Sequence, residues 1–328
     1  MKAFANTNAR DLKHAATVAA ETARSGRAAS FAGGGSDLLQ LAKDRIVSPD
    51  VIVNLKTVKG LDGIASNRDI TTIGGLTTLD AISRHDGVRR SFPVLAEAAE
   101  SVATPQIRNV GTIAGNVCQR PWCWYFRNGF PCLKNGGTTC FSVVGENQFH
   151  AIFGGGPSYI VHPSDTAPAL VALDARFRIA GPSGERVVPA SEFFVLPLNN
   201  PAKENVLAND EVLASIEIPA PKAGTRSTYH KVLDREAWTH AVVSAAMVME
   251  MDGPTCRSAR VVLGGVAPIP WRLPEVEKLL TGQRMSPELA ERAATAAVAG
   301  ARPLQKNAYK IPLVKGIVRR TLSELARA

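Results

Sequence analysis

Four of the five cysteines lie close together in the sequence, in a pattern that suits metal binding. Cys118, Cys123, Cys132 and Cys140 follow the spacing C-x4-C-x8-C-x7-C, whereas Cys256 stands alone. Disulfide bonds are rare in reducing compartments, so we expect thiolate ligation instead. The spacing lacks the paired C-x2-C of a zinc ribbon, and four irregularly spaced thiolates suit a cubane iron-sulfur cluster at least as well. Zinc is the alternative, and Cys256 is expected to be a buried, inert thiol.

Two glycine-bearing loops form the second chemically suggestive feature. The first, AGGGSDL (32–38), leads from a predicted strand into a predicted helix, where bare backbone N–H groups can cradle a phosphate. Alone, it is equally typical of a plain turn. A second small-residue loop, GTIAGN (111–116), favours the phosphate interpretation, because a pyrophosphate between two nucleosides needs contact from two sides. Neither loop shows G-x-G-x-x-G followed by an acidic residue, which disfavours a nicotinamide fold and favours a flavin nucleotide.

Short apolar runs and turn residues predict the elements that position these loops. In the first half we expect strands at 28–32, 51–55 and 70–73. We expect helices at about 36–43, at 78–83 with Thr77 as the N-cap, and at 95–102, ending near Pro105. The segment 110–117 is β-prone, and the cysteine segment is expected to be a loop. Strands at 159–161, 177–179 and 212–218 and a helix at 166–173 complete this part.

A Pro-rich and Gly-bearing stretch at 219–224 is the best candidate for a linker. Beyond it we expect strands at 228–233, 241–251 and 258–263 and helices at 274–280, 287–299 and 311–326. We therefore divide the chain near residue 222.

Composition limits the class of protein. The chain has 328 residues, 38 basic against 29 acidic side chains, and 45% hydrophobic residues. This length suggests roughly two domains, and the apolar fraction excludes general disorder. No run approaches the roughly 18 apolar residues of a membrane span. The first fifteen residues lack the apolar core of a secretory signal. We therefore expect a cytoplasmic protein, unless a signal-bearing partner exports it to the periplasm. The basic residues are scattered, which disfavours nucleic acid binding, apart from a tail that suits a solvated helix face or a docking surface (Lys306, Lys310, Lys315, Arg319, Arg320).

Five segments together resemble the FAD-binding medium subunit of the xanthine dehydrogenase, or molybdenum hydroxylase, family. They are FAGGGSDLL (31–39), ATPQIRNVGTIAGN (103–116), HPSDTAPAL (162–170), EVLASIEIP (211–219) and YHKVLDREAWTHAVVSAA (229–246). The insertion at about 117–160 resembles the subunits that hold an additional [4Fe-4S] cluster, as in bacterial aldehyde oxidoreductases and 4-hydroxybenzoyl-CoA reductases.

The resemblance implies an α+β fold. Residues 1–222 would form a two-subdomain FAD-binding domain of the PCMH, or vanillyl-alcohol-oxidase-like, type, with subdomains at about 1–56 and 57–222. Residues 223–328 would form a smaller α+β domain with an antiparallel sheet and helices.

The resemblance also implies roles for individual residues. The first loop would wrap the FAD pyrophosphate, the second would form the opposite wall, and residues from both domains would contact the flavin. No side chain is expected to act as an acid, base or nucleophile, and His162 suits a structural turn better than proton transfer. The implied FAD contacts are Ala32, Gly33, Gly34, Gly35, Ser36, Asp37, Leu38, Ala103, Ile107, Thr112, Gly115, Asn116, Ser164, Asp165, Leu213 and Lys231. The implied cluster ligands are Cys118, Cys123, Cys132 and Cys140, shielded by Trp122, Trp124, Tyr125 and Phe126.

On this interpretation the chain is an electron-transfer subunit of a heterotrimer. A large subunit with a molybdenum cofactor would oxidise an aldehyde or an N-heterocycle, and a small [2Fe-2S] subunit would pass the electrons to this chain. FAD would then deliver them to NAD, oxygen, a quinone or a carrier protein. The alternatives are a stand-alone FAD reductase on the same scaffold and a zinc-stapled binding module.

Overall fold

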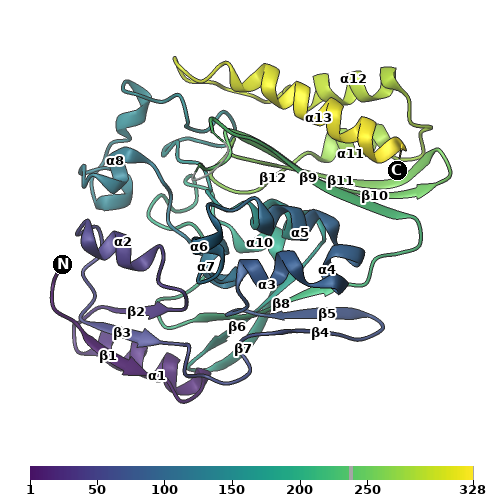
Figure 1. The fold of residues 1–328 in the computed structure, drawn as a ribbon. Helices are drawn as coiled ribbons and strands as arrows, with labels where there is room; N and C mark the ends of the chain where they lie inside the picture. The colour runs from purple at the N-terminus through teal and green to yellow at the C-terminus, as the bar shows by residue number, and fades with distance from the viewer. Residues whose placement is uncertain (236–238, 328) are drawn as a thin grey trace.

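The computed structural model describes residues 1–235 and 239–327, and residues 236–238 of the fifth family-like segment lie outside this description. The chain folds around three sheets (Figure 1). The first is parallel, with the strand order β1-β3-β2. Because parallel neighbours need a crossover, β1 (Ala5–Asn8) is followed by helix α1 (Leu12–Arg24) before β2 (Ala29–Ala32). After β2, helix α2 (Leu38–Lys43) leads to β3 (Val51–Asn54).

The second sheet is antiparallel, with the order β4-β5-β8-β6-β7. Its central strand, β8, lies far downstream of β4 and β5 in the sequence. The cysteine segment therefore lies, in the sequence, between strands of this one sheet. Its strands are β4 (Ile64–Ser66), β5 (Ile70–Gly74), β6 (Arg176–Gly181), β7 (Gly184–Pro189) and β8 (Val212–Pro219). Its helices are α3 (Leu79–Arg84), α4 (Asp86–Ser91), α5 (Pro93–Glu100), α6 (Pro105–Arg108), α7 (Ile113–Val117), α9 (Thr166–Ala172) and α10 (Ala190–Phe193).

The third sheet is antiparallel and is covered on both faces. Helices α5 and α9 pack on one side, and α12 and α13 lie on the other (Figure 1). Double coverage explains why the strand from Val243 onward is apolar almost without alternation. The strands are β9 (Thr225–Val232), β10 (Val243–Asp252), β11 (Thr255–Gly264) and β12 (Trp271–Arg272), and the helices are α11 (Pro274–Leu280), α12 (Pro287–Ala296) and α13 (Lys310–Arg327).

The cysteine segment forms an irregular insertion with one short helix, α8 (Trp124–Arg127), and two 3-10 turns, Leu133–Asn135 and Phe141–Val143. Side-chain amides replace the missing regular hydrogen bonds: Asn147 Nδ2 donates to the Ser142 carbonyl, and Asn307 Nδ2 donates to the His150 carbonyl. Figure 1 shows α8 above α2, on the same side of the molecule. The predicted loop character is therefore confirmed for most of the segment.

Most predicted elements are confirmed to within a few residues, and four details are wrong. The β-prone segment at 110–117 contains helix α7, because the Thr112 hydroxyl accepts a hydrogen bond from Gly115 N and caps the helix. No strand forms at 159–161. Thr78, rather than Thr77, caps α3, and Pro105 begins α6 instead of ending a helix, since proline suits the first turn.

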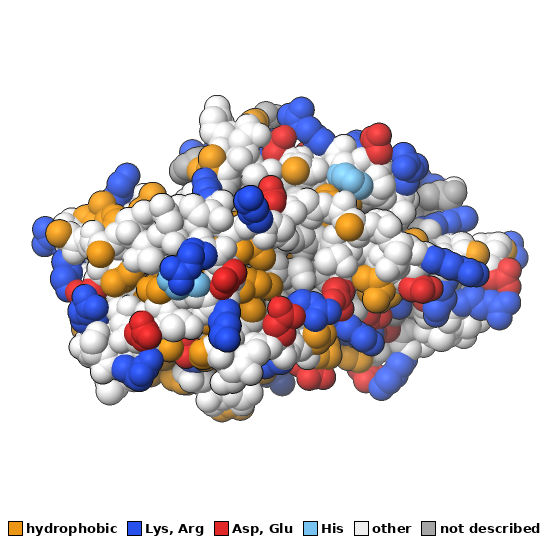
Figure 2. All heavy atoms as spheres, turned by 90° about the horizontal axis from the view of Figure 1, so that it is seen from below, with side chains coloured by type: hydrophobic (Ala, Val, Ile, Leu, Met, Phe, Trp, Pro, Cys, Tyr) orange, Lys and Arg blue, Asp and Glu red, His pale blue; other side chains and the backbone are white. Residues whose placement is uncertain are grey.

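Charges of both signs are interspersed over the face that Figure 2 shows, in keeping with the scattered basic residues of the sequence. No helix within residues 1–235 and 239–327 has the length and apolar character needed to cross a bilayer. The basic tail is not a uniformly solvated face, because the Lys310 side chain is fully buried at the start of α13. Its Nζ donates to the carbonyls of Phe149 and Gly265, at 2.9 and 2.6 Å, and so ties α13 to the insertion.

Lys310 predicts a specific dependence of stability on pH. Burial lowers its pKa from 10.5 to about 7, so above pH 7 the folded chain holds a neutral amine, which still has two N–H groups for the two carbonyls. The unfolded chain keeps its proton up to about pH 10.4. Between these values the unfolded state binds more protons, so stability rises with pH, by about 1.4 kcal/mol per pH unit at most.

The test is the free energy of unfolding of wild type minus that of Lys310→Met, measured by denaturant titration from pH 7 to 9.5. We expect this difference to rise with pH. The variant should be less stable throughout, because two carbonyls lose their donor. A difference that is constant over this range would contradict a neutral buried amine.

Candidate functional site

The two glycine loops meet backbone to backbone. A Cβ atom built on Gly34 would lie 1.9 Å from the Val110 carbonyl oxygen, and one on Gly33 would lie 3.1 Å from Thr112 Oγ1. Gly35 has a φ of +74°, which favours glycine. The first loop can therefore pass against the second only because it lacks side chains. Both loops line a common space, but the second loop bonds its N–H groups within the protein: Ile113 N donates to the Thr77 carbonyl and Ala114 N to the Gly75 carbonyl.

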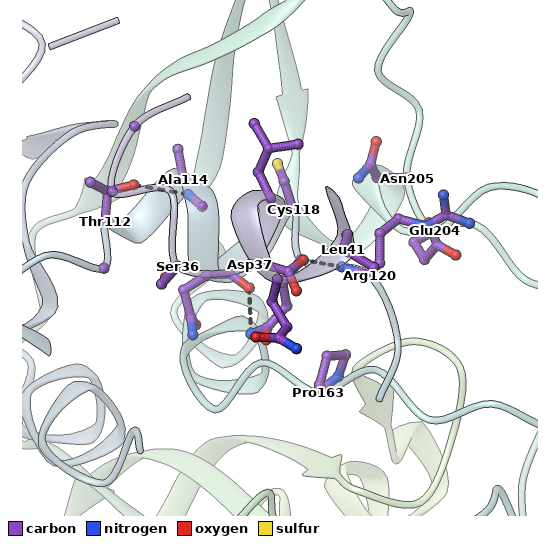
Figure 3. A pocket seen from close by; sticks show the side chains of 18 of the residues that line it. Ser36, Asp37, Leu41, Thr112, Ala114, Cys118, Arg120, Pro163, Glu204 and Asn205 are labelled. Atoms are coloured by element: carbon purple, nitrogen blue, oxygen red, sulfur yellow. Dashed lines mark hydrogen bonds and ion pairs between the residues drawn. The ribbon is translucent and has the colours of Figure 1, made fainter. Parts of the chain in front are cut away.

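That space is a cavity of about 840 Å³, lined by both loops and by the insertion. Figure 3 shows Ser36, Asp37, Thr112 and Ala114 around it. Of the residues predicted to contact FAD, those along the cavity wall are Ala32, Gly33, Gly34, Gly35, Ser36, Asp37, Leu38, Ala103, Ile107, Thr112, Gly115, Asn116, Asp165 and Leu213. Ser164 and Lys231 lie behind this wall. The cavity size and the close glycine contact both fit a dinucleotide held between the loops.

The second loop is braced from behind by a buried hydrogen-bond network. The Asn116 Oδ1 atom accepts from Ser164 Oγ at 2.6 Å and from Thr166 Oγ1 at 2.7 Å, and Ser164 Oγ accepts from Ala167 N. Each hydroxyl is thus already engaged within the protein. Ser164 thus holds Asn116 in place, and its contact with the flavin stays a prediction. Ala103, which adopts an uncommon positive φ of 44°, lines the cavity beside this loop.

Asp165 forms a buried ion pair across the two halves of the chain. Its Oδ2 lies 2.7 Å from Lys231 Nζ, with each side chain 4% exposed, and its Oδ1 accepts from Tyr229 Oη at 2.6 Å. Lys231 Nζ also donates to the Ser101 carbonyl. Burial and the nearby Asp165 carboxylate raise the pKa of Tyr229 well above its usual value, so the phenol remains a donor. Lys231 therefore reaches the site through Asp165.

Three of the four clustered cysteines share one region. Burial raises the pKa of Cys123 to about 11, with contributions from Cys140 and Cys132, and its Sγ lies 3.3 Å from His150 Nε2. Cys132 packs in a small core with Leu41 and Phe126. Cys140 Sγ accepts a weak hydrogen bond from Tyr159 N. Cys123 and His150 also line the cavity, so the thiol region borders the nucleotide space.

Cys118 lies apart from this group. It ends α7, packs against the main core and lines the cavity, and burial raises its pKa to about 12. Within residues 1–235 and 239–327, no three His, Cys, Asp or Glu side chains converge closely enough to form a metal site. The Cys123 thiol beside the His150 imidazole nevertheless suits a soft metal, because ligation would stabilise a thiolate that burial otherwise disfavours.

The sequence reasoning missed the charged residues that hold the insertion on the cavity wall. The buried Glu204 carboxylate lies 2.6 Å from Lys134 Nζ and 2.8 Å from Arg120 Nε. Arg127 Nη2 lies 2.7 Å from Asp37 Oδ1, and its guanidinium stacks over Trp122. Trp122 in turn lies 5.1 Å from His240, ring centre to ring centre. The available signal was the run RPWCWYFR (120–127), in which an arginine stands at each end of an aromatic stretch around Cys123.

His162 packs edge-on against Phe194, away from the cavity wall, and burial lowers its pKa to about 3.

Comparison with known proteins gives a consistent result. Residues 2–221 match the family model described as FAD binding domain in molybdopterin dehydrogenase, and residues 228–325 match CO dehydrogenase flavoprotein C-terminal domain. The chain is 34% identical over 305 residues to the aldehyde oxidoreductase FAD-binding subunit PaoB of Escherichia coli (strain K12), covering 92% of each chain.

The chain is also 29% identical to the carbon monoxide dehydrogenase medium chain of Hydrogenophaga pseudoflava, covering 91% of this chain and 89% of the relative. A solved structure of carbon monoxide dehydrogenase from that organism, which lacks the Mo-pyranopterin moiety of the molybdenum cofactor, superposes with a TM-score of 0.77 at 26% identity. That match covers 98% of this chain and 96% of the other.

The contact at Gly34 predicts that even one methyl group is too large. In Gly34→Ala the new Cβ must push the Val110 carbonyl away, which separates the loops. We expect FAD binding to weaken about a hundredfold, equivalent to about 3 kcal/mol. The measurement is the dissociation constant for FAD after mild deflavination of the purified protein. Gly316→Ala is the matched control, since its Cβ would meet open space. Equal FAD affinity in the two variants would contradict the loop assignment.

Proposed function

The chain belongs to the FAD-binding medium subunits of the molybdenum hydroxylase family, and on this premise we propose that it passes electrons between FAD and a [4Fe-4S] cluster within one polypeptide. The observation that carries the proposal is the shared wall: one cavity is lined by both glycine loops and by Cys123 with His150. A flavin placed in the loops would therefore border the thiol region. When bound, FAD supplies the exchange between two-electron and one-electron transfer, and the cluster supplies single-electron transfer.

The chain's own contribution is to bind, orient and shield. The first loop would hold the pyrophosphate through its backbone N–H groups, the second would form the opposite wall, and the network behind Asn116 would fix that wall. Leu213 would pack on the ring system, with Asp165 at the flavin end held by Lys231 and Tyr229. No side chain of this chain is assigned acid, base or nucleophilic chemistry. Its residues set position and access for the electron carriers.

We further propose the surroundings in which this subunit works. A large subunit with a molybdenum cofactor and a small [2Fe-2S] subunit would supply electrons, and NAD, oxygen, a quinone or a carrier protein would accept them. A cluster held by cysteine thiolates needs reduced cysteines, which favours a reducing compartment such as the cytoplasm. Residues 1–222 would form the FAD-binding domain, with its insertion at about 117–160, and residues 223–328 would form the C-terminal domain.

The first test is the composition of the purified complex. We expect one FAD and four irons per chain, with flavin absorption bands and a broad cluster shoulder at about 400 nm. A colourless protein containing zinc would support the zinc-stapled module instead. A flavoprotein that runs as a homo-oligomer without larger subunits would support the stand-alone reductase.

The cluster assignment predicts that Cys132→Ser loses iron while the protein remains folded. Cys132 is 7% exposed and packs beside Cys123, so a serine there removes a thiolate at the centre of the group. Iron and acid-labile sulfide per chain are the measurements. Cys256→Ser is the control, because that thiol is buried in the C-terminal core and belongs to β11 rather than to the insertion. Four irons retained in Cys132→Ser would overturn the ligand set.

The position of Cys118 predicts a different result for Cys118→Ser. Although the sequence pattern includes Cys118 among the ligands, its side chain packs on the main core rather than with the other three. We expect this variant to keep its iron within the error of the analysis. Loss of iron in Cys118→Ser, with the fold intact by circular dichroism, would show that the end of α7 moves to complete the ligand set.

A further inference from the structure

The Asp37 carboxylate of the first glycine loop is held by the insertion. Asp37 sits where it could cap α2 but makes no capping bond. Instead its Oδ2 accepts from Arg120 N at 3.0 Å, and its Oδ1 accepts from Arg127 Nη2 at 2.7 Å. Figure 3 shows Asp37 and Arg120 joined across the pocket. Both bonded residues belong to the segment that carries Cys123.

Arg127 is itself rigidly placed. Its Nε donates to the Pro121 carbonyl and its Nη2 to the Arg120 carbonyl, each at 2.9 Å. Its guanidinium lies 4.2 Å from the centre of the Trp122 ring, and its side chain is only 8% exposed. The backbone N of Arg127 donates to the Cys123 carbonyl, at 2.9 Å. One turn of helix therefore links a proposed cluster ligand to the residue that holds the loop.

This helix cannot keep its shape unaided. α8 has four residues, and the flanking segments contain only two short 3-10 turns, whereas isolated helices below about 12 residues are marginal even with favourable sequences. Packing supplies the order that the structure shows. Since metal binding commonly drives the folding of such irregular segments, ligation of Cys123 would hold Arg127 more firmly.

The charge of Arg127 matters as much as its position. Asp37 lies in the loop that would cradle the FAD pyrophosphate, so an unpaired carboxylate there would repel the two phosphates. Arg127 neutralises this carboxylate. Loss of Arg127 should therefore harm FAD binding more than loss of the Asp37 charge does.

We propose that Arg127 is a positioning residue that couples the thiol-bearing insertion to FAD binding by holding and neutralising Asp37. The proposal rests on the function given above. Its consequence is that flavin affinity depends on whether the cluster is present, although the two groups are bound by different parts of the chain. Loss of the cluster would loosen α8, release Arg127 and expose the Asp37 charge to the pyrophosphate.

A double-mutant cycle in the purified complex tests the positioning role. The readouts are FAD per chain and the dissociation constant for FAD after mild deflavination. We expect Arg127→Met to weaken FAD binding at least about tenfold and Asp37→Asn to weaken it only a few-fold. The double variant should bind FAD better than Arg127→Met alone, because it no longer contains an unpaired carboxylate.

This recovery is a result that general damage to the fold would not produce. Arg84→Met is the control, since Arg84 is an exposed arginine of α3 paired with Asp80, and it should leave the affinity unchanged. A double variant as weak as, or weaker than, Arg127→Met would overturn the positioning role.

The coupling to the cluster is tested by Cys132→Ser, made in the wild-type chain and in the double variant. In the wild-type background, iron loss should be accompanied by FAD binding about tenfold weaker. In the Asp37→Asn/Arg127→Met background it should cause no further weakening. Iron loss with unchanged flavin affinity in the wild-type background would overturn the coupling.

Failure of this inference can be distinguished from failure of the proposed function. A wild-type complex that contains FAD but no iron would overturn the cluster and the coupling to it, while the Asp37 and Arg127 cycle would still decide the positioning role. A complex without FAD would overturn the proposed function itself.

Discussion

The close approach of two backbone loops is the constraint on which the site depends. The Gly34 Cα lies so near the Val110 carbonyl that no side chain fits between them. This contact brings the end of a parallel strand from the first sheet against a loop that belongs to the second. A cavity lined by the backbone of both loops results. The remaining features of the site, including the hydrogen bonds behind Asn116 and the ion pair of Asp165, fix the walls that this contact brings together.

Much of the fold follows from local sequence rules. Strands β2, β3, β5, β6, β8 and β9–β11, and helices α2, α3, α5, α9 and α11–α13, were predicted from apolar periodicity and turn residues to within a few positions. The segment at 110–117 was misassigned because its small and β-branched residues fit a strand, whereas the capping hydroxyl of Thr112 decides for a helix. Sheet order could not be predicted, because the pairing of β5 with β8 joins residues about 140 positions apart.

The glycine loops were recognisable because their chemistry is local, and the structure places most of their predicted contacts on one cavity wall. The contacts of Ser164 and Lys231 were not, since each bonds a partner distant in sequence: Asn116 for the first and Asp165 for the second. The same limit applies to the cysteines. Spacing groups Cys118 with the other three, but α7 carries it toward the cavity and the main core. Spacing along the chain therefore does not determine which thiols converge.

The ion pair of Asp165 and Lys231 also constrains how this subunit can evolve. Its partners come from the two regions that separate family models recognise, residues 2–221 and 228–325, and Glu97 adds a second bridge by accepting from Thr228 and from Tyr229 N. Removing one member of a buried pair leaves an uncompensated charge, at a cost of about 3–5 kcal/mol. The C-terminal region is therefore not a freely interchangeable module: chimeras between relatives would need both ends of each bridge to be inherited together.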